Sequence, residues 1–176
     1  MKNDDLKLGS RILIGAIAGF AGTLAMTAAM RRMHEKLPAK ERYPLTPREI
    51  IDSTAEQADV PLPEEASKDV TTAAHFAYGA ASGALLGVAN VMMGPFAGAT
   101  AGVGVWIGSY LGWIPGVGIL KPATEHPHRR NMLMIAAHVV WGAATAQAMR
   151  ELVAARETIL AGGEGRDAPP EGRKKP

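Results

Sequence analysis

Uncharged stretches alternate with charged ones along the chain, and this pattern predicts helices that cross a membrane. Residues 12–30 and 131–149 contain no Asp, Glu, Lys or Arg, and neither does the longer run at 70–120. About 20 apolar residues span the hydrocarbon core of a bilayer as a helix. Each outer run therefore fits one crossing and the central run fits two. We expect spans at about 12–33, 70–92, 95–116 and 131–150.

Two other interpretations of these runs are less consistent with the sequence. A soluble protein with a Gly/Ala-rich helical core is one, but its amphipathic helices would need a charged, wet face. A signal peptide is the other, because Lys2, Lys7 and Arg11 precede the first run. The length of that run and the Arg31-Arg32 pair that follows it favour a retained span.

Polar sequence surrounds and separates these spans. We expect an N-terminal segment at 1–11, a polar loop at 34–69 and a disordered tail at 151–176, which is rich in Gly, Pro and charge. Within the loop, Thr46 is followed by Pro and, three residues on, by Glu49. This pattern predicts a helix start with Thr46 as the cap and Glu49 closing a capping box. A short helix on the membrane surface is the expected result.

The chain contains an internal repeat. Residues 73–83 and 136–146 are identical at six of eleven positions, including one His in each copy. The glycine pattern of 15–19 also recurs at 94–98. Each half then consists of one helix, a polar loop and a His-bearing helix, and the two halves run in the same direction, as in a parallel repeat. The predicted fold is all-α, an integral membrane four-helix bundle built from two similar helical hairpins.

Glycines recur at intervals of four residues in the central uncharged run. Residues four apart share one face of a helix, and small residues on a face let the backbones of apolar helices approach closely. The ladders either pack the helices within the chain or face another chain. Their members are Gly79, Gly83 and Gly87; Gly94, Gly98 and Gly102; and Gly104, Gly108 and Gly112.

His75 and His138 occupy equivalent positions near the starts of two predicted spans. An ionisable side chain inside a membrane is costly, which makes it a candidate functional group. Paired histidines on facing helices are suited to hold a b-type haem, to bind a divalent metal or to pass a proton. The alternative is a neutral imidazole bonded to a helix carbonyl or a hydroxyl. No Lys or Arg lies nearby in these helices for haem propionates, so neither haem b nor a metal is the favoured interpretation.

A second cluster lies in the loop before the last span. Glu125, His126 and His128 are candidate ligands for a divalent metal at the surface. The signal is weak, because one loop supplies all three and no fourth ligand is nearby. A solvated turn before a helix start is the simpler interpretation.

The sequence offers no catalytic set. It contains no cysteine, no phosphate-binding loop and no nucleophile motif, and the predicted spans contain no acidic residue. Coupled cation transport ordinarily needs carboxylates within the membrane. A net charge of +2 is too small to indicate nucleic-acid binding.

Several segments together resemble the small uncharacterised bacterial inner-membrane proteins of the YagU-like kind. They are 15–19, 43–49, 106–115, 123–127 and 138–142. The resemblance covers most of residues 12–150. It implies a helical, multi-pass protein of the bacterial inner (plasma) membrane, and it transfers no catalytic residue.

The expected function is therefore non-enzymatic. We predict an accessory or assembly subunit, or a homo-oligomer, whose partners are the lipid bilayer and either other membrane subunits or itself, with no nucleic acid. One alternative is a haem- or metal-binding membrane protein that uses His75 and His138. Another is a channel or permease for small solutes, lined by hydroxyl groups.

Overall fold

The computed structural model describes residues 6–42 and 44–162, and this part of the chain is all-helical, with no strand. The helical character predicted from the sequence is confirmed. A π-helical turn at Gly108–Trp113 joins α4 to α5. The helices are α1 (Leu8–His34), α2 (Thr46–Gln57), α3 (Glu64–Asn90), α4 (Pro95–Ile107), α5 (Ile114–Gly116) and α6 (His128–Glu157), with short 3-10 turns at Ala39–Glu41 and Ala123–Glu125.

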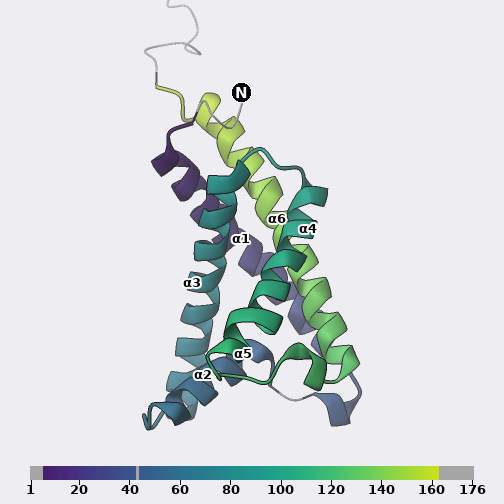
Figure 1. Ribbon diagram of the computed structural model, residues 1–176. Helices are drawn as coiled ribbons and strands as arrows, with labels where there is room; N and C mark the ends of the chain where they lie inside the picture. Colours follow the sequence, from purple (N-terminus) through teal and green to yellow (C-terminus); the bar gives the residue numbers. More distant parts are fainter. Residues whose placement is uncertain (1–5, 43, 163–176) are drawn as a thin grey trace, which may run out of the picture.

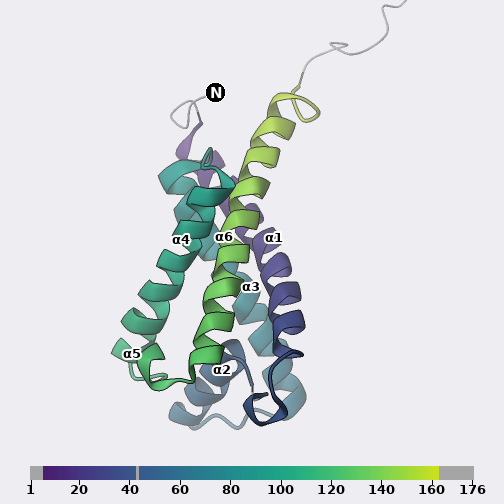
Figure 2. The ribbon, with the colours of Figure 1, turned by 90° about the vertical axis from the view of Figure 1, so that its right-hand side faces the viewer.

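The long helices lie side by side and alternate in direction. In Figures 1 and 2, α1 and α4 run from the end marked N toward the end that holds α2 and α5, whereas α3 and α6 return. α1 packs against both α3 and α6, and α4 packs against α6. A tight turn connects α3 to α4, in which the Asn90 side chain accepts a hydrogen bond from the backbone N–H of Met92 at 2.9 Å. The spatial order is thus α3, α1, α6, α4.

The contact between α1 and α3 is backbone against backbone. A Cβ added at Gly15, Gly19, Gly83 or Gly87 would lie closer than 3.0 Å to backbone atoms of the facing helix. At Gly79 it would collide with the Thr23 hydroxyl. Side chains larger than hydrogen are therefore excluded at these five glycines, as expected for helices that associate through small residues.

The contact between α4 and α6 follows the same principle. A Cβ added at Gly98 would meet the carbonyl of Gly142, and one at Gly102 would meet the carbonyl of His138. α1 and α6 are joined by Gly22, which faces Thr145, and by the Trp141 indole, which donates to the Gly19 carbonyl at 3.3 Å.

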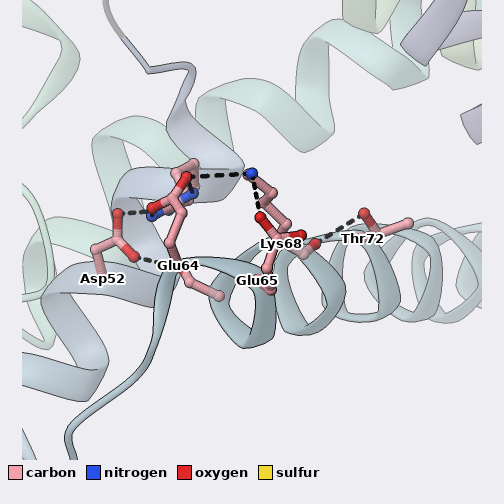
Figure 3. A network of polar contacts seen from close by, with 7 residues as sticks. Asp52, Glu64, Glu65, Lys68 and Thr72 are labelled. Atoms are coloured by element: carbon pink, nitrogen blue, oxygen red, sulfur yellow. Dashed lines mark hydrogen bonds and ion pairs between the residues drawn. The ribbon is translucent and has the colours of Figure 1, made fainter.

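Helix α2 closes one end of the molecule. Arg48 bonds to the carboxylates of Asp52 and Glu64, each at 2.6 Å, and Ser67 donates to Asp52 at 2.6 Å. Figure 3 shows how this network, extended by Lys68, fastens α2 to the start of α3. The hydrogen bond from Arg48 holds the pKa of the Glu64 carboxyl below its usual range.

Two details of the helix ends differ from the sequence prediction. α2 does begin at Thr46, but the helix has no side-chain cap, and Glu49 binds Arg130 of α6 instead of closing a capping box. α6 continues through Glu157, so part of the predicted tail at 151–176 is helical. It continues because Val153 extends the apolar face and packs with Leu6 and Ile14. Residues 163–176 lie outside the described part of the chain.

α1 and α6 are each long and apolar enough to cross a membrane, by length and composition alone. α4 has 13 α-helical residues before the π-helical turn begins. α3 has a lower mean hydropathy than α1. Its first turns contain the charged residues of 64–69, and the rest of the helix is rich in Gly and Ala rather than in large apolar residues.

Candidate functional site

A cavity of about 240 Å³ lies among α1, α3, α4 and α6 and is covered at one end by α2. Among the described residues, no Asp, Glu, Lys or Arg lines it, and most of its surface is aliphatic or aromatic. The residues in its wall that can form hydrogen bonds through their side chains are Thr23, Thr46, His75, Tyr78, Ser82, Ser109, Tyr110, Trp113, His138 and Trp141. A mostly apolar cavity with a few convergent polar groups is the usual form of a small-molecule site.

Both histidines singled out from the repeat open onto this cavity. His138 is 8% exposed, and its Nδ1 lies 2.7 Å from the Met134 carbonyl. A carbonyl only accepts, so Nδ1 carries the proton and Nε2 of the neutral ring is an acceptor. This bond to a helix carbonyl is the one considered above as the alternative to a ligand role, yet it leaves Nε2 available.

His75 is less constrained. Its Nε2 is buried and has no hydrogen-bond partner within the described residues. Its ring contacts Phe76 edge-on, with centroids 5.9 Å apart. A buried polar nitrogen without a partner costs about 1–3 kcal/mol relative to one that is satisfied, so Nε2 of His75 is an unsatisfied polar atom in the cavity wall.

The side of the cavity between α3 and α4 is closed by side chains rather than by helix packing. The Tyr78 and Ser109 hydroxyls lie 2.6 Å apart. Ser109 donates its proton to the Val105 carbonyl at 2.7 Å, so Tyr78 is the donor to Ser109. The Tyr78 ring also contacts Trp113, with centroids 6.1 Å apart. Tyr78 and Trp113 are 40% and 45% exposed, so these two side chains also form part of the outer surface of the protein.

A buried ion pair stands at the α2 end of the cavity. Arg130 is 5% exposed and forms a two-pronged bond with the Glu49 carboxylate, one arm of which measures 3.0 Å. It also donates to the Thr46 hydroxyl at 3.1 Å. The sequence does not predict this pair, because Arg130 lies directly before the uncharged run at 131–149 and far from Glu49. The two residues are 81 positions apart, and no local pattern links them.

The predicted glycine ladders divide into two groups. Gly79, Gly83, Gly87, Gly98 and Gly102 lie in the internal helix contacts described above. A Cβ added at Gly94, Gly104 or Gly108 would meet nothing within 4 Å, and one at Gly112 would meet the Ile107 carbonyl at 4.0 Å.

The uncovered glycines share the outer surface of α4 and the following turn with large apolar side chains. Phe96 is 88% exposed, Ile107 48% and Leu111 45%. We call Phe96, Gly104, Ile107, Gly108 and Leu111 the α4 outer face.

The structure does not bring the loop residues Glu125, His126 and His128 together. Glu125 pairs with Lys121 at 3.5 Å. His126 Nε2 lies 3.1 Å from the Lys121 carbonyl, and His128 is exposed at the start of α6. Within the described part of the chain, no three His, Asp or Glu side chains are grouped so that they could hold a metal ion.

Comparison with known proteins adds no relative. No family model, no curated protein and no solved structure matches the chain. The function is therefore argued from the geometry described above.

Proposed function

We propose that this chain is a non-enzymatic, multi-pass protein of the bacterial inner membrane that associates with a second copy of itself through the α4 outer face. Its long helices would cross the bilayer as a four-helix bundle of two similar hairpins, α1 with α3 and α4 with α6. The observation that carries the proposal is that a Cβ added at Gly104 or Gly108 would meet no described atom within 4 Å, whereas Gly79, Gly83, Gly87, Gly98 and Gly102 lie in internal helix contacts.

Equivalent contacts in the two hairpins support the repeat. The sequence repeat equates Gly19 with Gly98, Gly79 with Gly142 and Gly83 with Ala146. A Cβ added at Gly19 would meet the Gly79 carbonyl and Gly83, and one added at Gly98 would meet the Gly142 carbonyl and Ala146. The same register of helix packing thus recurs in both halves.

The composition of the outer surface supports a membrane setting. Large apolar residues on α1 and α4 face outward, among them Leu13 at 60%, Leu24 at 56% and Phe96 at 88% exposure. On α1 the exposed apolar residues Leu13, Ile17, Phe20 and Leu24 recur at helical spacing, and soluble monomers rarely expose large apolar patches. In a bilayer the same side chains contact lipid.

Symmetry favours a second copy as the partner of the α4 outer face. Two copies inserted in the same orientation are related by an axis along the membrane normal, which brings their α4 helices together in parallel. Glycines four apart allow such parallel helices to approach closely. The face carries no charge, so nothing on it opposes self-contact.

Disulfide crosslinking tests this contact directly, because the chain contains no cysteine. In the Gly104→Cys variant the new side chain meets nothing within the chain. Disulfides form when Cα atoms approach to about 4.4–6.8 Å. We expect mild oxidation in membranes to convert most of this variant to a covalent dimer. The Leu85→Cys variant, on the 73% exposed edge of α3, is the matched control and should remain monomeric.

The outcomes separate the alternatives. Equal crosslinking at both positions would mean random collision and would refute the contact. No crosslinking at either would refute self-association. A photoreactive group attached to the Gly104→Cys variant that labels a different membrane protein would replace self-association by an accessory role in another complex.

Haem binding is the second candidate function, and one observation favours it. Both imidazoles open onto one cavity, and His138 Nδ1 donates to a carbonyl, which is how a metal-ligating histidine is usually oriented. The absence of Arg and Lys from the cavity wall disfavours it. An absorption spectrum of the purified protein beside the His75→Ala/His138→Ala double variant decides, since a Soret band that the variant lacks would establish haem.

A further inference from the structure

We propose that the cavity between α3 and α4 binds a neutral lipophilic molecule that carries one hydroxyl group, such as a long-chain alcohol or an alkylphenol. The hydroxyl would bond to both His75 and His138. This goes beyond the proposed function and shares with it only the membrane setting, because the cavity and the α4 outer face involve different residues.

The wall of the cavity selects a neutral and mostly apolar ligand. It contains no charged side chain. The buried Arg130 guanidinium at the end of the cavity is paired with the half-buried Glu49 carboxylate. A charged ligand would lose its hydration in such a site without gaining a counter-charge, which is strongly unfavourable. The aliphatic side chains of Met26, Ile50, Val105 and Met134 offer contacts to a hydrocarbon instead.

The two histidines select a group that both donates and accepts a proton. His138 uses its Nδ1–H for the Met134 carbonyl, so its Nε2 accepts. His75 Nε2 is buried without a partner in the described residues and, when protonated, donates. A hydroxyl satisfies both at once, because its oxygen accepts from His75 while its proton is donated to His138. A ketone or an ester carbonyl has no proton to donate and would leave Nε2 of His138 without a hydrogen bond. An alkane would leave both histidines without one.

The seam between α3 and α4 provides the route of entry. These helices diverge from their connecting turn, and α3 packs on α1 while α4 packs on α6. The seam is held at the cavity by the bond between Tyr78 and Ser109 and by the ring contact between Tyr78 and Trp113. In a bilayer this seam faces the acyl chains, so a lipophilic molecule would reach the cavity from the membrane without passing through water.

The volume fits a head group and part of a chain. The cavity of about 240 Å³ equals about eight water molecules at about 30 Å³ each. A longer hydrocarbon chain would extend through the seam toward lipid.

Tryptophan quenching tests the proposal, because Trp113 and Trp141 line the cavity. The probe is 12-bromododecan-1-ol, whose bromine quenches indole fluorescence, and the matched control probe is 1-bromododecane, which lacks the hydroxyl. Both are titrated at equal mole fraction in detergent micelles containing the wild-type chain. A net hydrogen bond changes affinity by about fivefold. We expect the alcohol to quench saturably and to bind at least about tenfold more tightly than the bromoalkane.

Variants of the chain test the hydrogen bond between the alcohol and His75. His75→Phe keeps a ring in place and should weaken the alcohol about fivefold while leaving the bromoalkane unchanged. His128→Phe changes an exposed histidine outside the cavity and should have no effect. Ala74→Leu adds volume to the cavity wall and should weaken both probes.

Several results would overturn the proposal. Equal, non-saturating quenching by both probes would mean that the probes only partition into the micelle. Alcohol binding that is unchanged in His75→Phe would remove the histidine from recognition. A Soret band in the purified protein would give the cavity to haem. If the variants do not fold, the wild-type comparison of alcohol with bromoalkane still decides. None of these results depends on whether Gly104→Cys crosslinks.

Discussion

A single added methyl group should have opposite effects on two glycines of the same uncharged run. Gly83 lies in the α1–α3 contact, where a Cβ would stand 2.5 Å from the Cα of Gly19, whereas ordinary contact begins at 3.4 Å. Gly104 lies on the α4 outer face, where a Cβ meets nothing within 4 Å. Gly83→Ala and Gly104→Ala are therefore chemically identical changes in different surroundings.

The expected magnitudes follow from the geometry. To accept Gly83→Ala, α1 and α3 must separate by roughly 1 Å, and a gap of 0.5–1 Å forfeits a quarter to a half of each affected van der Waals contact. Overpacking of this kind costs about 1–3 kcal/mol. Gly104→Ala suffers no collision and gains helix propensity, which is worth up to about 1 kcal/mol. The two variants should therefore differ by about 1–4 kcal/mol in free energy of unfolding.

Unfolding in mixed micelles measures this difference. Each variant is titrated with a denaturing detergent at a low protein-to-detergent ratio, at which the chain is monomeric, and helix content is followed by circular dichroism. Gly83→Ala should unfold at a lower denaturant fraction than wild type, and Gly104→Ala at the same or a higher fraction. Equal midpoints for the two variants would refute the assignment of these glycines to an internal and an external face.

Three further changes test other parts of the structure. Glu49→Ala removes the carboxylate partner of the buried Arg130 guanidinium and should destabilise the fold by about 2 kcal/mol; stability close to wild type in the same titration would show that the pair is not formed. The hydrogen bond from Arg48 lowers the pKa of Glu64, so its stabilising effect is present above the ordinary pKa of 4.5 and is lost as pH falls through the lowered value. A fluorophore attached to α2 should accordingly become more mobile in acid. In the Glu64→Gln variant the mobility of this fluorophore should depend less on pH. Tyr78→Phe removes one hydrogen bond across the seam and should cost about 1 kcal/mol, without lowering helix content.

Local sequence patterns predicted where helices begin, but they did not predict which residues contact one another between helices. The helix start at Thr46 follows from residues that are neighbours in sequence. The role of Glu49 does not, because its partner Arg130 lies at the start of α6. A Glu at this position can close a capping box or form a long-range ion pair, and the local sequence is the same in both cases. Only the packing of α2 decides between them.

The glycines and histidines illustrate the same limit. A spacing of four shows that glycines share a face, but it does not say whether a helix covers that face, and Gly83 and Gly104 differ in this respect. The repeat predicted that His75 and His138 are equivalent. That both open onto one cavity depends on the divergence of α3 from α4, for which neither helix carries a signal in its sequence.

The spatial order α3, α1, α6, α4 has a consequence for the order of synthesis. α1 and α3 are able to pair once the turn after Asn90 has left the ribosome, whereas α4 must wait for α6, which follows it in the described part of the chain. α6 then completes the second pair and also joins it to the first through Thr145 and Gly22. A chain truncated before α6 would expose the faces of α1 and α4 that α6 otherwise covers. These exposed faces are a feature by which membrane quality control would recognise such a truncated chain.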